Sequence, residues 1–350
     1  MKLVKTKDAV GCVLCHDMTQ IIPGQKKGPV FKKGHIVQEK DIPVLLSIGK
    51  ENLYVWENKK GFLHENDAAK ILCDICMKDS SDMRASEPSE GKIEIFAKKK
   101  GLLKINSKAL FKLNNIGQMM VATIHGNLPV NVGDKIAGTR IIPLVIEEKK
   151  MRRAVRIVGR EPLLKIIPFV HKNAAIVTTG SEIKKGLIKD AFGATLKSKL
   201  MEYEVNVIGQ VFPGDDLEEI KKEILSFADA GADLILCTGG MSVDPDDRTP
   251  AAIKACGAKI VSYGAPVLPG AMFLLSYLRR GKKMIPVLGL PGCVMYAART
   301  IFDLCLPRLL CGERLSAKDL SSFGEGGLCH GCKECRYPNC GFGSVARGLR

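Results

Sequence analysis

The stretch Leu236–Pro250, LCTGGMSVDPDDRTP, decides the fold of its part of the chain. The apolar run that leads into it is typical of a buried strand, and the turn Gly239-Gly240 follows directly. Thr249-Pro250 then predicts the start of a helix. Glycines between a strand and a helix let backbone N–H groups approach an anion, and the helix N-terminus favours negative charge. The stretch therefore predicts an anion-binding turn in an α/β fold.

Three acids, Asp244, Asp246 and Asp247, lie in the loop after the glycines. Carboxylates beside an anion site repel the ligand unless they hold a divalent cation or handle protons. The loop thus predicts an anionic ligand bound with Mg²⁺. The alternative is that the glycines only turn a corner of an α/β protein and that the acids belong to an ordinary polar surface loop.

The sequence around this stretch alternates between strands and helices from Ala174 onward. We expect strands at 174–178, 205–211, 233–237 and 284–290, and helices at 186–203, 215–230, 249–256 and 293–310. Strands separated by helices of this length predict a mostly parallel sheet covered on both faces, a three-layer α/β domain. In such sheets ligands bind beyond the carboxyl ends of the strands. Four predicted loops, 178–182, 213–216, 237–240 and 289–292, carry glycines at that edge.

Four motifs resemble one known family. TGSE at 179–182, the acidic pair at 215–216, TGGMSVDPDDRTP at 238–250 and GLPG at 289–292 are similar to motifs of the molybdopterin-binding domain of molybdenum-cofactor biosynthesis proteins. This resemblance covers about residues 170–312. More loosely, GCVLCHDMTQIIPG at 11–24 resembles the entry region of the molybdotransferase branch.

The resemblance implies roles for individual residues. Asp247 falls on the family's catalytic acid, which binds Mg²⁺ or molybdate, and Asp216 is a second catalytic candidate. The residues implied to bind the pterin or its phosphate are Thr179, Gly180, Ser181, Glu182, Asp190, Asp215, Thr238, Gly239, Gly240, Ser242, Thr249, Pro291 and Gly292. Glu182, Asp215 and Asp216 have the alternative of only capping helices.

The resemblance implies Mg²⁺-dependent insertion of molybdate or tungstate into adenylated molybdopterin. The chain also departs from the family: Phe192 and Cys293-Val294 replace the usual Asn and Asn-Pro, and a serine–aspartate–glycine motif of the N-terminal region is absent. We also expect no C-terminal β-domain after residue 312. These departures favour pterin binding over molybdotransfer. They keep open a non-catalytic carrier that delivers the finished cofactor to a molybdoenzyme apoprotein, or a redox-sensing binding protein.

Residues 1–168 form a predicted β-rich α+β region, divergent from the molybdotransferases, with helices at 65–78 and 107–115 and a charged linker or helix start at 147–153. This region holds 30 Lys and Arg against 18 Asp and Glu, most of the net charge of +16. The basic residues occur in short groups without interleaved aromatic residues. We therefore expect attraction of small phosphorylated ligands and not nucleic-acid binding.

The last segment, 313–350, is predicted to be a linker and a metal-binding tail. Its cysteines, Cys329, Cys332, Cys335 and Cys340, have the spacing C-x₂-C-x₂-C-x₄-C, which favours an iron–sulfur cluster over zinc. His330 is an alternative zinc ligand, and a purely redox or disordered tail is the third possibility. The pairs Cys12/Cys15 and Cys73/Cys76 lie in apolar patterns that predict core positions.

The bulk composition bounds the remaining questions. With 46% hydrophobic and 26% charged residues and no apolar run of about 18, the chain predicts a globular protein without a membrane span. No secretory signal is recognisable, so we expect the cytoplasm. The apolar helix predicted at 293–310 further suggests a homo-oligomer. We place the domain boundaries at 1–168, 169–312 and 313–350.

Overall fold

The computed structural model describes residues 2–22, 26–55, 60–78, 80–242, 244–245 and 247–343. The chain divides into two compact units. Met1–Lys98, Asn106–Ile124 and Gly133–Leu164 form the first, and Lys99–Ile105, His125–Val132 and Lys165–Arg350 form the second. The second unit contains every residue of the predicted pterin site and of the cysteine tail.

A six-stranded mixed sheet organises the second unit, in the order β15-β14-β16-β19-β18-β17. Its strands are β14 (Asn173–Thr178), β15 (Asn206–Val211), β16 (Leu234–Thr238), β17 (Lys259–Tyr263), β18 (Leu274–Arg280) and β19 (Lys283–Leu290). The four predicted strands, β14, β15, β16 and β19, pair in parallel, which confirms that part of the prediction. The other two pair antiparallel and were not expected, so the sheet is mixed.

Two apolar cores cover the faces of this sheet. Along β16, Leu234 and Leu236 face one core while Ile235 and Cys237 face the other, the alternation that a strand imposes. Helices α6 (Phe192–Met201) and α9 (Ile301–Leu310) supply the first core; α7 (Leu217–Asp229) and α8 (Thr249–Ala255) supply the second. The predicted three-layer arrangement, with helices on both faces, is therefore present.

The predicted helix 293–310 is interrupted. A 3₁₀ turn, η3 (Gly292–Met295), is followed by α9, which begins after Thr300 because the Thr300 and Asp303 side chains form a capping box there. Every residue of α9 is buried within its own unit. Its apolar pattern is thus explained by the core, and the homo-oligomer stays a prediction.

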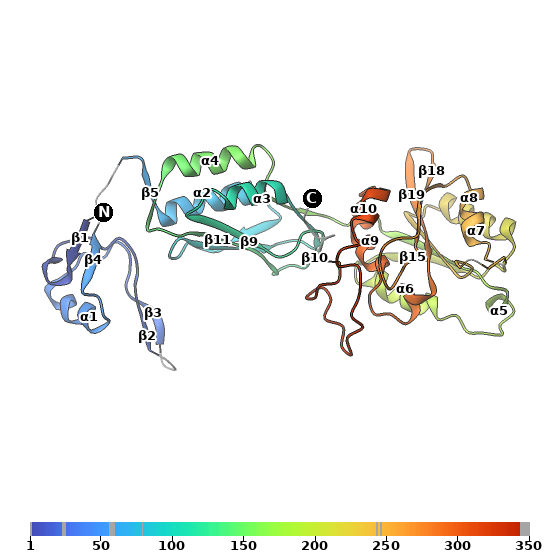
Figure 1. Cartoon of the computed structure of the whole chain (residues 1–350), viewed down its shortest axis with the longest axis horizontal. Helices are drawn as coiled ribbons and strands as arrows, with labels where there is room; N and C mark the ends of the chain where they lie inside the picture. Colours follow the sequence, from blue (N-terminus) through green and yellow to red (C-terminus); the bar gives the residue numbers. More distant parts are fainter. Residues whose placement is uncertain are drawn as a thin grey trace. The chain divides into compact units, whose positions relative to one another are not determined.

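Antiparallel sheets and α-helices form the first unit, as expected for a β-rich α+β region. Strands β6 (Met83–Ala85), β7 (Lys92–Ala97), β11 (Lys135–Ile141) and β9 (Met119–Thr123) form its main sheet, and α2 (Glu65–Met77), α3 (Ser107–Asn114) and α4 (Glu148–Val158) lie along one side of it (Figure 1). The charged segment after residue 147 thus begins a helix.

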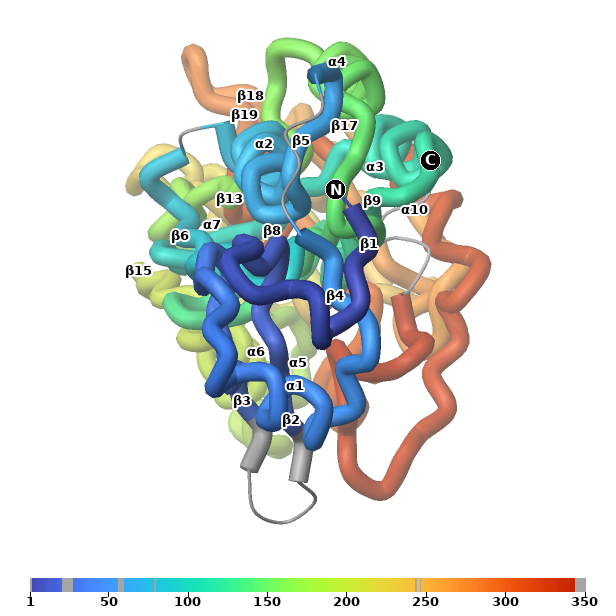
Figure 2. Tube along the Cα trace, turned by 90° about the vertical axis from the view of Figure 1, so that its left-hand side faces the viewer, coloured from blue at the N-terminus to red at the C-terminus, as the bar shows by residue number. Residues whose placement is uncertain are grey.

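The N-terminal part of the first unit has a small core of its own around Leu14, Leu45 and Leu53. Its elements are β1 (Lys2–Lys5), η1 (Thr6–Asp8), β2 (Met18–Ile22), β3 (Lys26–Phe31), η2 (Glu39–Asp41), α1 (Ile42–Ser47) and β4 (Asn52–Val55), while β5 (Phe62–His64) pairs with β12 (Val145–Glu147). Strands β2 and β3 lie side by side as a hairpin (Figure 2).

The remaining elements belong mostly to the second unit. Strands β10 (Pro129–Val130), β8 (Gly101–Ile105) and β13 (Leu164–Ile167) form a three-stranded sheet in that order, and α5 (Ser181–Lys184) and α10 (Ala317–Ser321) are short helices. Within the residues that the structure describes, no helix has the length and apolar character that a bilayer span requires.

Candidate functional site

The glycine turn after β16 is held between two neighbouring elements. Gly239 and Gly240 have φ values of +81° and +53°, which L side chains rarely adopt. The Thr249 hydroxyl, at the start of α8, donates to the carbonyl of Gly239 at 2.9 Å, and the Thr249 N–H donates to the carbonyl of Gly240 at 3.3 Å. A Cβ on Gly239 would lie 2.2 Å from the carbonyl oxygen of Thr179. This crowding explains why glycine occupies the position.

The predicted threonines build the framework behind this turn. The hydroxyls of Thr179 and Thr249 are 3.0 Å apart and buried. Since the Thr249 hydroxyl donates to Gly239, Thr179 must donate to Thr249. The fully buried Thr238 hydroxyl has no hydrogen-bond partner within the part of the chain that the structure describes. The Thr179 and Thr249 side chains thus fix the turn from behind, and none of the three threonines lines the pocket described next.

A pocket of about 470 Å³ opens at the carboxyl ends of β16 and β19. Ligand pockets of α/β sheets occur at this edge. Six residues predicted from the sequence line it, namely Gly239, Gly240, Ser242, Asp247, Pro291 and Gly292. The other lining residues are Phe192, Met241, Ala271, Met272, Cys293, Met295 and Tyr296.

Asp247 is half-buried and is the one acid, among those the structure describes, that lines this pocket. Its N–H donates to the Asp244 carbonyl at 3.0 Å, and its Oδ2 accepts from the Asp244 N–H at 3.3 Å. Burial, and then the nearby Asp247 carboxylate, raise the pKa of the Tyr263 phenol, whose Oη donates to the carbonyl of Met241 at 2.8 Å. The Asp247 carboxylate thus has unused acceptor capacity. Asp246 lies outside the described residues.

The other predicted acids satisfy backbone N–H groups. The Asp216 carboxylate caps α7 by accepting from Glu219 N at 2.9 Å, and Asp215 accepts from Ser181 N at 2.8 Å. Asp190 accepts from the backbone N–H groups of Phe192 and Gly193, both in the first turn of α6, and from the Gln210 side chain at 2.7 Å. Asp216 and Asp190 therefore act at helix starts, and neither lines the pocket.

The TGSE loop lies at the end of the neighbouring strand β14. Gly180 has a φ of +135°, and Ser181 and Glu182 begin the short helix α5. The Glu182 side chain is folded back: a Cβ on Gly180 would lie 2.7 Å from its Oε1. None of the three residues lines the pocket.

Sequence reasoning missed the apolar wall of the pocket. Phe192 and Met241 are 7% and 5% exposed, whereas Tyr296 is 80% exposed. From the sequence, Phe192 and Cys293 were noted only as departures from the family and not as wall residues. Met272 was missed because that residue precedes a strand that was not predicted. Aromatic rings and methionine thioethers are the side chains that pack best on a planar ring system. Burial raises the pKa of Cys293, so its thiol is neutral at pH 7.

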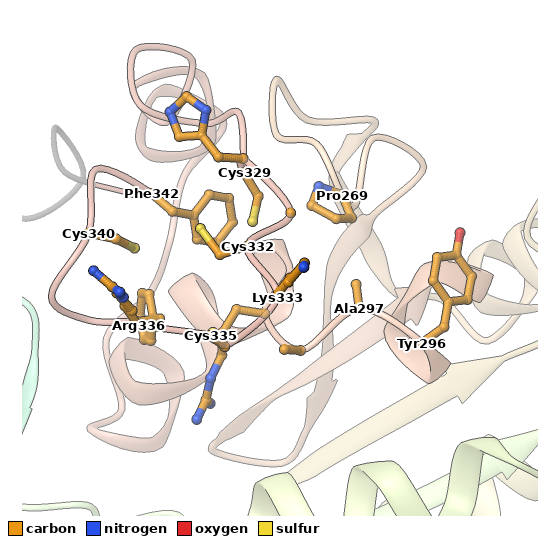
Figure 3. Close-up of a pocket in the computed structure, with 15 residues that line it drawn as sticks. Pro269, Tyr296, Ala297, Cys329, Cys332, Lys333, Cys335, Arg336, Cys340 and Phe342 are labelled. Atoms are coloured by element: carbon orange, nitrogen blue, oxygen red, sulfur yellow. The ribbon is translucent and has the colours of Figure 1, made fainter.

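A second pocket, of about 420 Å³, is lined by the cysteine tail (Figure 3). Cys329, Cys332, Cys335 and Cys340 all border it, and Tyr296 borders both pockets. As placed, the sulfur atoms do not converge: no group of three or more His, Cys, Asp or Glu in the described residues is arranged to hold a metal.

The two other C-x₂-C pairs lie elsewhere. Cys73 and Cys76 are buried on α2, and burial raises the pKa of Cys73 to about 11 and that of Cys76 further. Cys15 is also buried, and Cys12 is half-buried. Three of these four cysteines are therefore core residues, as predicted, and the buried thiols are neutral.

A glycine turn, one carboxylate and an apolar wall meet at the carboxyl edge of the sheet, where α/β sheets bind ligands. Residues 175–310 match the family model of the probable molybdopterin binding domain. This part of the chain is therefore similar to the molybdopterin-binding domains of molybdenum-cofactor biosynthesis proteins. Residues 3–57 match a domain of unknown function, DUF8806.

Individual relatives cover less of the chain. A CinA-like protein of Mycobacterium avium is 33% identical over 93 residues, which are 26% of this chain and 21% of the relative. A CinA-like protein of Mycobacterium leprae is also 33% identical over 93 residues, with 26% and 22% covered. The match thus spans about a fifth of the length of these relatives.

Among solved structures, the tungsten cofactor synthesizing protein MoaB of Pyrococcus furiosus is 18% identical, with 42% of this chain and 99% of that chain covered and a TM-score of 0.35. CinA of Thermoplasma acidophilum is 21% identical, with 35% and 89% covered and a TM-score of 0.29.

Proposed function

We propose that the pocket at the ends of β16 and β19 binds molybdopterin or adenylated molybdopterin. One observation carries the proposal: the glycine turn, Asp247, the Pro291-Gly292 turn and the apolar wall meet in one cavity of about 470 Å³. The two turns would hold the phosphate, where backbone N–H groups can approach closely. The wall formed by Phe192, Met241 and Tyr296 would hold the pterin ring.

We further propose that Asp247 holds Mg²⁺ beside the phosphate. Mg²⁺ takes one or two carboxylates together with phosphate oxygens and water, and a single half-buried carboxylate with unused lone pairs fits this demand. When bound, the ion would neutralise phosphate charge. The chain's own contribution to insertion of molybdate or tungstate is positioning: the turns fix the phosphates, and the wall orients the pterin and excludes water.

A carrier that delivers the finished cofactor to a molybdoenzyme apoprotein is the second candidate. The capping roles of Asp190 and Asp216 favour it, because they leave Asp247 as the single carboxylate lining the described pocket. A pocket with one carboxylate is equipped to bind, whereas proton transfer during molybdate insertion requires further groups.

Titration of the full chain with molybdopterin and with its adenylate, with and without Mg²⁺, tests the proposal. We expect saturable binding that Mg²⁺ strengthens, and loss of the Mg²⁺ effect in Asp247→Asn but not in Glu218→Gln, an exposed acid on α7. Molybdenum content of the pterin product after incubation with molybdate separates the candidates: incorporation identifies an enzyme, and binding without incorporation identifies a carrier. Absence of pterin binding by the wild-type chain would refute both.

A further inference from the structure

The cysteine tail is fastened to the second unit at both of its ends. Leu268 N donates to the carbonyl of Gly327 at 2.8 Å, and Cys329 N donates to the carbonyl of Leu268 at 2.8 Å. At the other end, Gly343 N donates to the carbonyl of Gly326 at 2.8 Å, and Phe342 is buried at 3% exposure in the core beneath. The ends of the segment 329–343 are therefore held next to each other.

The middle of this loop has no packing of its own. Residues 330–336 are all exposed and contain neither helix nor strand. A short exposed segment of this kind does not bury enough apolar surface to hold one conformation, and small loops are commonly held by disulfides or metals instead. Ligation of a metal by the tail cysteines would fix this loop.

The four tail thiols border one pocket, although their sulfur atoms do not converge as placed. Cys329 and Cys340 are half-buried and pack against the core, so the fastened ends fix their positions. Cys332 and Cys335 lie on the exposed middle, and all four border one pocket of about 420 Å³ around Phe342 (Figure 3). Four thiols at one pocket are the donor set that a single thiolate-ligated centre uses.

Cationic side chains also border this pocket. A centre with four thiolate ligands carries net negative charge, which nearby cationic groups offset. Lys333 and Arg336 line the pocket, and no ion pair of either is recorded in the described part of the chain. Arg299 also lines it, but that guanidinium is engaged by Glu202 and Asp303 at 2.9–3.1 Å.

We propose that Cys329, Cys332, Cys335 and Cys340 bind a thiolate-ligated metal centre, an iron–sulfur cluster or a zinc ion. Binding closes segment 330–336 over the pocket, because ligand formation and loop ordering share one free energy. Tyr296 lines this pocket and the pterin pocket, so the centre lies beside the proposed cofactor site. A centre at this position could sense or alter the bound cofactor, and this consequence rests on the proposed function. The metal site itself does not rest on the proposed function.

Metal analysis of the anaerobically purified full chain tests the site without any pterin. We expect about one zinc ion, or about four iron atoms with matching acid-labile sulfide and brown colour, per chain. Cys332 and Cys335 are exposed, so replacing them should not disturb the fold. We expect a Cys332→Ser/Cys335→Ser variant to keep its circular dichroism spectrum and to lose the metal. Cys12→Ser, which alters a half-buried thiol of the first unit, should keep it.

Limited trypsin digestion adds a readout that does not depend on metal stoichiometry. Lys333 and Arg336 are exposed, so the metal-free chain should be cleaved at both, and loading with zinc, or with iron and sulfide, should protect them. Zinc alone and iron with sulfide both support the proposal and identify its metal. Metal that stays substoichiometric after reconstitution, or that the double variant retains, overturns it, whatever the outcome of the pterin titration.

Discussion

Replacing Gly239 with alanine tests whether the glycine turn is as tightly enclosed as its geometry indicates. An L residue in the left-handed region costs about 1–2 kcal/mol, and φ is +81° here. The added Cβ would also lie 2.2 Å from the carbonyl oxygen and 2.9 Å from the hydroxyl of Thr179. Thr179 has little freedom to move, because its N–H donates to Thr238 at 2.7 Å and its hydroxyl pairs with Thr249.

Forcing a methyl group into a packed site costs about 1–3 kcal/mol more. We therefore expect Gly239→Ala to lower the free energy of unfolding by about 2–5 kcal/mol. Gly231→Ala is the matched control, since Gly231 precedes the same strand, has a φ of +95° and has no atom within 4 Å of an added Cβ. It should cost only the conformational part, about 1–2 kcal/mol.

Urea denaturation followed by circular dichroism measures both variants, and titration with molybdopterin measures their affinity. We expect the second-unit transition to shift more for Gly239→Ala than for Gly231→Ala, and pterin affinity to fall only in the former. Equal destabilisation of the two variants would show that the crowding at Thr179 is not energetically important. Unchanged pterin affinity in a folded Gly239→Ala protein would show that this turn does not hold the phosphate.

Three further substitutions probe separate features. Lys199→Met removes the buried ammonium that donates to both Asp303 oxygens at 2.7 and 2.9 Å. Urea denaturation should show that the free energy of unfolding falls by about 3 kcal/mol. This is the low end for a broken buried pair, because Arg299 still contacts the Asp303 carboxylate. Burial raises the pKa of Glu65 from 4.5 to about 7. Its contribution to stability is therefore complete below pH 4.5 and is lost as the pH rises through 7. Glu65→Gln should remove this pH dependence from urea midpoints measured across that range. Tyr263→Phe frees the loop carbonyls that the phenol binds and should weaken pterin affinity about 5-fold by titration, the equivalent of one hydrogen bond.

The parallel half of the sheet could be predicted because its strands are short apolar runs bounded by glycines. Strands β14, β15, β16 and β19 begin and end within one residue of their predicted limits. The antiparallel pair could not be found in the same way. The apolar run of β18 is compatible with a helix or a strand, and its pairing with β19 is established only when the Gly281 turn closes the hairpin.

Positions with unusual backbone geometry were the predictable part of the site. Gly239 and Gly240 both have positive φ and line the pocket, which is why their residue type carries information. The acids were harder, since an Asp before a helix satisfies backbone N–H groups as readily as it binds a ligand. Asp216 caps α7, and spacing alone could not separate it from Asp247.

The residues that line the pocket indicate how binding energy would be divided between the pterin ring and the phosphate. The apolar wall is extensive, and Asp247 is the single carboxylate among the described residues that line the pocket. The ring would therefore supply a metal-independent part of the affinity, and the phosphate with Mg²⁺ the rest. Removal of Mg²⁺ should then weaken binding of the adenylate, with its additional phosphate, more than binding of molybdopterin. Tyr296→Ala should weaken both equally, because its ring would contact the part that they share.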